Sequence, residues 1–77
     1  MTTLLVINKD TKGIIYQITR TLAANDINIA TMKLTRQEKG ATACCVIETD
    51  DVIPEKVEAK ILENENVIYA KIINLGE

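Results

Sequence analysis

The residues best suited to bind a small charged molecule lie together near the start of the chain, at residues 8–13, with the sequence NKDTKG. The segment joins an apolar run to a stretch with helical spacing, so it brings an amide, a carboxylate and a glycine to the start of a helix. Free N–H groups of a first helical turn, here near residues 13 to 15, carry partial positive charge and can take a carboxylate. Asp10 beside them can take an ammonium group. Because an α-amino acid carries both charges, the segment predicts a site for a zwitterion.

Asp10 has an alternative role, because Asp is common at the N-cap of a helix, where its side chain accepts a backbone N–H. The spacing alone favours this capping role over a binding role. As a binding site, the segment would contribute Asn8, Asp10, Lys12, Gly13 and Ile14. Both interpretations stay open at this point.

The rest of the chain offers little catalytic or metal-binding chemistry. The sequence contains no His, which is the commonest general base and metal ligand. A base would have to be a strongly desolvated Lys12 or Lys33. Cys44 and Cys45 are consecutive in a predicted strand and project to opposite faces, unlike the spaced thiolates of metal-binding loops. We therefore expect a non-enzymatic domain with no cofactor or metal of its own.

Charge and composition argue against nucleic acid or a membrane as the partner. The chain has 9 basic and 11 acidic residues and a formal net charge of −2. RNA-binding domains of related topology stack bases on aromatic residues of the central strands, whereas Tyr16 and Tyr69 lie outside those strands. No apolar stretch approaches the ~20 residues of a transmembrane helix, and the first residues do not resemble a signal peptide. With two adjacent cysteines that do not pair with each other, the sequence predicts a reducing, cytoplasmic location.

Hydrophobic spacing divides the chain into six elements within one domain. We predict strands at residues 3–7, 28–36, 42–48 and 67–73, and helices at residues 14–24 and from Pro54 onwards. A polar hairpin turn at residues 37–40 joins the second and third strands. This βαββαβ order predicts an α+β, ferredoxin-like domain over residues 1–77, with two helices on one face of a four-stranded antiparallel sheet.

A domain of this size buries a limited core, so self-association is a simple source of added stability. The uncovered face of the predicted sheet carries Thr and Lys side chains from the second strand, together with Cys44 and Val46 from the third. We expect Cys44, Val46 and Val67 to be exposed apolar positions that serve an interface.

The sequence resembles an ACT domain, the small regulatory module attached to many enzymes of amino-acid metabolism. The family pattern is a hydrophobic strand, then Asp/Asn-x-Pro-Gly, an apolar helix, and a short loop into Asn-Ile. It is matched here by residues 4–7, by Asp10-Thr11-Lys12-Gly13, by residues 14–24 and by Ile27-Asn28-Ile29. The resemblance covers nearly the whole chain and implies a ferredoxin-like fold and a non-catalytic, amino-acid-binding role.

Within that family, residues 28–40 (NIATMKLTRQEKG) and 46–50 (VIETD) resemble the C-terminal ACT domain of the bacterial iron–sulfur L-serine dehydratase β chain. This likeness implies L-serine or another small amino acid as the ligand. It also implies a parent L-serine ammonia-lyase whose iron–sulfur cluster lies outside this domain. The serine-binding ACT domain of D-3-phosphoglycerate dehydrogenase is the main alternative.

In serine-binding members of the family, the ligand sits between two ACT domains. The resemblance implies contacts from Asn8, Asp10 and Gly13 of one chain and from Asn28 of the other chain in a homodimer. The turn departs from the family pattern at Lys12, where Pro is usual, and at Asn8 and Asp10, where serine-binding relatives often have His and Asn. The alternative is a dimerisation module that binds no ligand and holds catalytic chains together.

Overall fold

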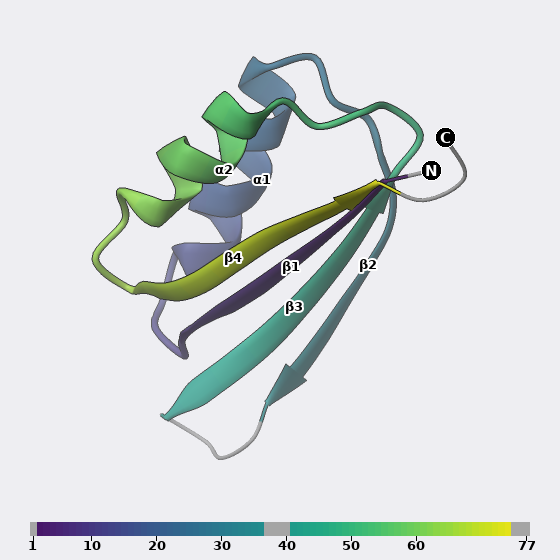
Figure 1. The fold of residues 1–77 in the computed structure, drawn as a ribbon. Helices are drawn as coiled ribbons and strands as arrows, with labels where there is room; N and C mark the ends of the chain where they lie inside the picture. Colours follow the sequence, from purple (N-terminus) through teal and green to yellow (C-terminus); the bar gives the residue numbers. More distant parts are fainter. Residues whose placement is uncertain (1, 37–40, 75–77) are drawn as a thin grey trace.

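The computed structural model describes residues 2–36 and 41–74 and contains the six predicted elements in the predicted order. The elements are β1 (Thr2–Lys9), α1 (Ile14–Ala24), β2 (Ile29–Arg36), β3 (Thr42–Thr49), α2 (Glu55–Leu62) and β4 (Val67–Asn74), as Figure 1 shows. The predicted hairpin turn at residues 37–40 lies outside the described residues. β1 is longer than predicted at both ends, so Asn8 belongs to the strand and not to the turn.

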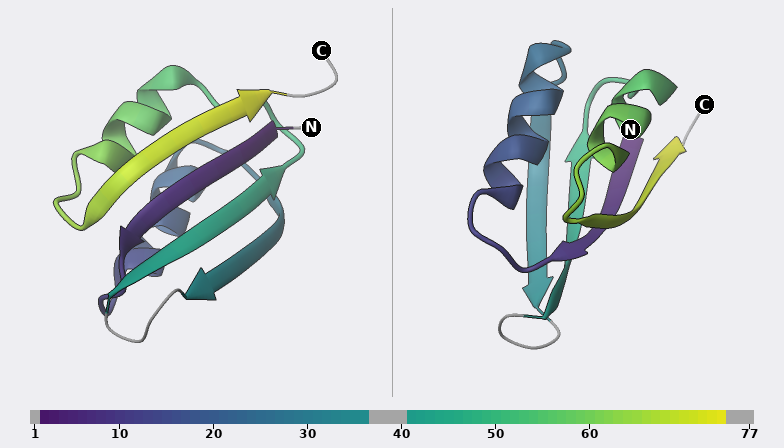
Figure 2. Two further views of the ribbon diagram at one scale, coloured as in Figure 1. Left: turned by 60° about the horizontal axis from the view of Figure 1, so that its bottom comes forward. Right: turned by 90° about the vertical axis from the view of Figure 1, so that its left-hand side faces the viewer.

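The four strands form one antiparallel sheet in the order β2-β3-β1-β4. Both helices lie on the same face of this sheet, and the other face is uncovered (Figure 2). The predicted ferredoxin-like fold is therefore confirmed. β2 and β4 are the two edge strands, and β3 and β1 are the central pair.

The core lies between the sheet and the helices. In β1 and β3 every second residue is buried, because side chains of a strand alternate between its two faces and one face packs against helices. Cys45 and Ile47 are fully buried on this face, opposite to Cys44 and Val46. The matching stripe of α1 consists of Ile14, Ile18 and Leu22, which are spaced at about one helical turn.

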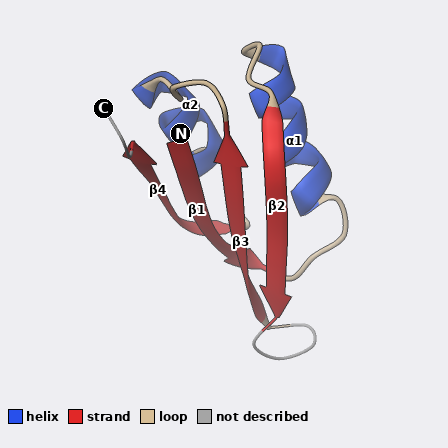
Figure 3. Cartoon of the chain, turned by 90° about the vertical axis from the view of Figure 1, so that its right-hand side faces the viewer, coloured by secondary structure: helices blue, strands red, loops and turns tan. Residues whose placement is uncertain are grey.

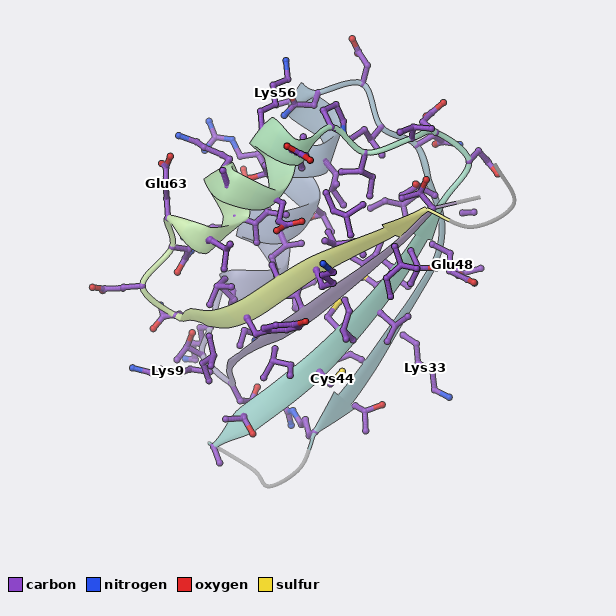
Figure 4. All side chains as sticks on the ribbon, viewed as in Figure 1. Lys9, Lys33, Cys44, Glu48, Lys56 and Glu63 are labelled. Carbon is purple, nitrogen blue, oxygen red and sulfur yellow. The ribbon has the colours of Figure 1, made fainter. Side chains whose placement is uncertain are left out.

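The uncovered face carries the residues predicted for it. Cys44 and Val46 are half-buried there, and Lys33 pairs with Val46 across the β2–β3 ladder. Lys33, Cys44 and Glu48 are labelled in Figure 4. The Thr31 hydroxyl donates to the Glu48 carboxylate at 2.7 Å. This face therefore mixes half-buried apolar side chains with charged ones.

The prediction that Val67 is exposed is wrong, because β4 contains an irregularity near its start. Ile7 pairs with Tyr69 and Asn8 pairs with Val67, so Ile68 has no partner of its own on β1. Such an extra residue shifts the alternation of side chains along a strand. Val67 is consequently buried in the core, and Ile68 is 54% exposed.

Candidate ligand-binding site

The β1–α1 turn is held by backbone hydrogen bonds to two neighbouring segments. The N–H of Lys9 donates to the carbonyl of Asn66 at 2.7 Å, and the N–H of Asp10 donates to the carbonyl of Ala41 at 3.0 Å. Gly13 follows with φ 81°, a left-handed conformation that glycine adopts without a steric penalty. A Cβ atom at Gly13 would meet no atom within 4 Å. The glycine is therefore required by its backbone conformation and not by lack of space.

The N-terminus of α1 has no side-chain cap. Gly13 is the N-cap residue, and the first intrahelical bond runs from the N–H of Gln17 to the carbonyl of Gly13 at 3.1 Å. The first turn also lacks acidic residues. The alternative role of Asp10 as the cap of this helix is thus wrong. The N–H groups at the start of α1 keep the geometry that favours an anion.

Asp10 instead forms an ion pair with Arg36, the last residue of β2. The Nε atom of Arg36 lies 3.2 Å from Oδ2 of Asp10, and the two side chains are 57% and 14% exposed, respectively. Arg36 reaches the turn because it pairs with Ala43, which faces the helices. The carboxylate that was predicted to meet a ligand ammonium therefore lies beside a cation of the same chain.

Asn8 lies beneath the turn, on the helix-facing side of β1. Its side chain is 1% exposed, and its Nδ2 group donates to the carbonyl of Lys9 at 2.9 Å. Its Oδ1 atom is buried and has no hydrogen-bond partner among the described residues. An unsatisfied buried acceptor costs about 1–3 kcal/mol. Asn8 therefore holds an acceptor that a donor entering the site would satisfy.

The remaining predicted residues are placed differently from one another. Lys12 is exposed in the turn, whereas the side chain of Ile14 is buried in the core. Ile14 can therefore contact a ligand only through its backbone. Asn28 is exposed directly before β2, where its N–H donates to Oδ2 of Asp51 at 3.1 Å.

The start of β2, which Asn28 directly precedes, and the β1–α1 turn lie at opposite ends of the sheet (Figure 3). Ile29 pairs with Thr49 of β3, which also pairs with Thr2 at the start of β1. Arg36 pairs with Ala43 of β3, which also pairs with Asn8 near the end of β1. An eight-residue strand rises by about 3.3 Å per residue, so roughly 20–25 Å separates the two ends. One chain therefore brings together Asn8, Asp10, Gly13 and Arg36 but does not add Asn28.

Arg36 is the site residue that the sequence did not indicate. The sheet order is needed to find it, because the ion pair joins the end of β2 to the turn after β1, and β3 lies between these two strands. The available signal was indirect. β2 and β1 both pair antiparallel with β3, so their C-terminal ends lie at the same level of the sheet and a charged residue at the end of β2 lies near the turn.

The fold and this turn together define the class of the protein. The model of the ACT domain family matches residues 2–66, and the chain belongs to that family. ACT domains are regulatory, non-catalytic modules.

Two curated relatives are similar over most of the chain. D-3-phosphoglycerate dehydrogenase from Bacillus subtilis is 35% identical over 68 residues, which are 88% of this chain and 13% of that protein. The enzyme of the same name from Methanocaldococcus jannaschii is 36% identical over 66 residues, which are 86% of this chain and 13% of that protein. The chain thus spans 13% of the length of these relatives. They match the alternative parent enzyme and not L-serine dehydratase.

A solved structure supports the fold independently. The ACT domain of GTP pyrophosphokinase from Chlorobium tepidum superimposes with a TM-score of 0.72 at 20% identity, covering 96% of this chain and 86% of that one. Within residues 2–36 and 41–74, no helix is long and apolar enough to cross a membrane. The same residues contain no cluster of His, Cys, Asp or Glu that could hold a metal ion.

Proposed function

We propose that the domain binds a small amino acid, with L-serine as the first candidate, and thereby regulates an enzyme of amino-acid metabolism to which it is attached. The observation that carries the proposal is the grouping at the end of β1. The uncapped start of α1, the carboxylate of Asp10 and the unsatisfied Oδ1 of Asn8 lie around one turn. These groups match the carboxylate and ammonium of a zwitterion.

We propose further that two copies pair along β2. Met32 and Leu34 pair with the helix-facing residues Ile47 and Cys45, yet they are 43% and 44% exposed. β2 is an edge strand, and a free strand edge is a template for pairing with another chain. Antiparallel pairing of two β2 strands about a two-fold axis would bury these side chains and extend the sheet to both copies.

This pairing also explains how Asn28 can contribute to the site. In an antiparallel pair, the start of one β2 lies beside the end of the other. Asn28 of one copy would then approach Arg36 and Asp10 of its neighbour. The dimer would contain two equivalent sites, each built from the turn of one chain and Asn28 of the other.

Two observations support different proposals for the attached enzyme. The curated relatives favour an enzyme similar to D-3-phosphoglycerate dehydrogenase, whereas residues 28–40 and 46–50 resemble L-serine dehydratase. In the second case the parent enzyme would carry an iron–sulfur cluster outside this domain. In both cases we propose a cytoplasmic location. A tenfold difference in affinity between two enzyme states, or about 1.4 kcal/mol, suffices for regulation.

Calorimetric titration of the 77-residue chain with the twenty amino acids tests the proposal. We expect heat and a rise in melting temperature with L-serine or another small amino acid. Binding by none of them at millimolar concentration would overturn the ligand-binding function.

Complementation tests whether two chains share each site. Asp10→Ala and Asn28→Ala should each weaken binding strongly when the variant is alone. In a mixed dimer of the two variants, the turn of the Asn28→Ala chain meets the intact Asn28 of the Asp10→Ala chain, so one site is restored. Mixing should therefore recover one ligand per mixed dimer, or about one ligand for every two dimers in an equimolar mixture that pairs at random. No recovery, in a mixture that demonstrably exchanges subunits, would exclude the shared site.

The second candidate function is dimerisation without a ligand. The exposed Met32 and Leu34 favour it as much as they favour the regulatory function. Light scattering that finds a stable dimer, combined with no binding of any amino acid, would support this function. A monomer at micromolar concentration would count against both.

A further inference from the structure

Arg36, which forms the ion pair with Asp10, is the last of three residues that lie side by side across β1, β3 and β2. Asn8 pairs with Ala43, and Ala43 pairs with Arg36, so the three side chains lie on the helix-facing side at one level of the sheet. Adjacent strands are about 4.8 Å apart, which puts the Cα atoms of Asn8 and Arg36 roughly 10 Å from each other. The small side chain of Ala43 separates them. An amide and a guanidinium thus flank the turn that carries Asp10.

Stabilisation of the turn does not account for this ion pair. Arg36 is 57% exposed, and ion pairs with an exposed partner contribute little to stability. The turn is already held by the backbone bonds of Lys9 and Asp10 to Asn66 and Ala41. The contact to Asp10 uses Nε of Arg36, and a guanidinium has five N–H donors in all. The side chain of Arg36 makes no other hydrogen bond to a residue that the structure describes.

We infer that Arg36 is a ligand-binding residue and that its ion pair with Asp10 exchanges partners when an α-amino acid binds. This inference rests on the proposed function and adds a residue that selects the class of ligand. The ammonium of the ligand takes the place of Arg36 at Asp10. The freed guanidinium and the N–H groups at the start of α1 bind the carboxylate of the ligand. The exchange leaves each charge of the site with an opposite charge, as before.

The exchange explains why a zwitterion would be preferred over either half of it. An amine without a carboxylate would displace Arg36 from Asp10 and leave the guanidinium with no anion. A carboxylate without an amine could bind the other N–H groups of Arg36, but it would bring no ammonium to Asp10. An Arg and a carboxylate side chain are suited to such exchange, because guanidinium–carboxylate bonds can be bidentate and directional.

Titration of the 77-residue chain with L-serine, ethanolamine and 3-hydroxypropionate tests the inference. Ethanolamine lacks the carboxylate of L-serine, and 3-hydroxypropionate lacks its ammonium. We expect the wild-type chain to bind L-serine at least tenfold more tightly than either half-ligand. Arg36→Gln should weaken L-serine at least tenfold and reduce its advantage over ethanolamine. Arg36→Lys should restore part of both, since it keeps the positive charge.

Arg20→Gln is the matched control, because Arg20 is an exposed arginine on α1 and the change removes the same charge. It should leave the affinity for L-serine and the preference over ethanolamine unchanged. Unaltered affinity and preference in Arg36→Gln would overturn the inference while leaving the proposed function intact. Equal losses in Arg36→Gln and Arg20→Gln would also overturn it, because net charge would then explain them. If the wild-type chain binds no amino acid, the proposed function fails and the inference fails with it.

Discussion

The two edge strands of the sheet are protected to very different degrees. α2 lies over the β4 side, where Val57 and Ile61 are buried. Its Glu58 carboxylate accepts a hydrogen bond from the N–H of Ile72 at 3.3 Å. Along β2, by contrast, Met32 and Leu34 are 43% and 44% exposed on the face that the helices cover elsewhere.

This difference indicates which edge is available to a partner. A side chain that occupies a strand N–H blocks the addition of another strand, and an uncovered edge with apolar neighbours favours it. α2 therefore blocks the β4 edge at Ile72, whereas none of the side-chain hydrogen bonds among the described residues blocks the β2 edge in this way. The site residues follow the same division, because Arg36 and Asn28 lie at the two ends of β2.

The largest expected effect concerns the helix that covers the β4 side. Ile61→Ala should lower the free energy of unfolding by about 2–5 kcal/mol, since it removes a buried side chain and leaves a cavity. Leu34→Ala should lower it by less than about 1 kcal/mol once dissociation is accounted for, because Leu34 is only half-covered. Urea unfolding at several protein concentrations separates domain stability from association. Equal losses would remove the distinction between the two sides.

The next effect concerns association through β2. Leu34→Lys should weaken the dimer at least tenfold, or about 1.4 kcal/mol, because it places a charge in the proposed interface. Ile68→Lys is the control, since Ile68 is comparably exposed on β4. Sedimentation velocity measures both dissociation constants. A dimer that tolerates Leu34→Lys but not Ile68→Lys would reverse the assignment of the open edge.

A smaller effect is expected from opening the β4 edge. Glu58→Ala removes the acceptor of the Ile72 N–H and should lower the free energy of unfolding by about 0.5–1.5 kcal/mol. Glu55→Ala is a matched control, because both glutamates lie in the first turn of α2 and share its dipole contribution. Urea unfolding should give the larger loss for Glu58→Ala. Equal decreases in the free energy of unfolding for the two variants would assign the effect to the helix dipole. The hydrogen bond from Ile72 would then not account for protection of the β4 edge.

The sequence predicted the fold wherever the signal was local. The alternation within β3 placed Cys44 and Val46 on the uncovered face, and helical spacing predicted the helix at residues 14–24. Both patterns arise because one face of each element is buried, so they are readable without knowledge of the neighbours.

The errors and omissions arose where strands distant in the sequence meet. The burial of Val67 depends on a register shift between β1 and β4. The ion pair of Arg36 with Asp10 depends on the order β2-β3-β1. The missing cap of α1 depends on the left-handed conformation of Gly13, which no spacing rule reveals. The sequence therefore identified the turn, but it did not reveal the ion pair of Asp10 or the missing cap of α1.

The smallest expected effect concerns the burial of β3, the strand beside β2. It is measured through the two cysteines of β3. Cys45 pairs with Leu34 and is fully buried, whereas Cys44 faces the uncovered side and is half-buried. Burial, and secondarily the neighbouring Cys44, raises the pKa of the Cys45 thiol above its ordinary value of 9.0. As the pH rises, the unfolded chain therefore loses this proton before the folded chain does. This contribution to stability is constant below pH ~9 and is lost progressively above it.

Urea unfolding between pH 7 and pH 10 measures this loss. We expect Cys45→Ala to reduce the decrease in stability at alkaline pH, and Cys44→Ala to reduce it less. Comparing variants cancels the titration of Tyr and Lys residues, which all of them share. A thiol reagent should also modify Cys44 before Cys45 in the folded chain, because the reactive species is the exposed thiolate. Equal modification rates for the two cysteines would mean that β2 separates from β3 often enough to expose Cys45. The weaker protection of the β2 edge would then reach a core residue.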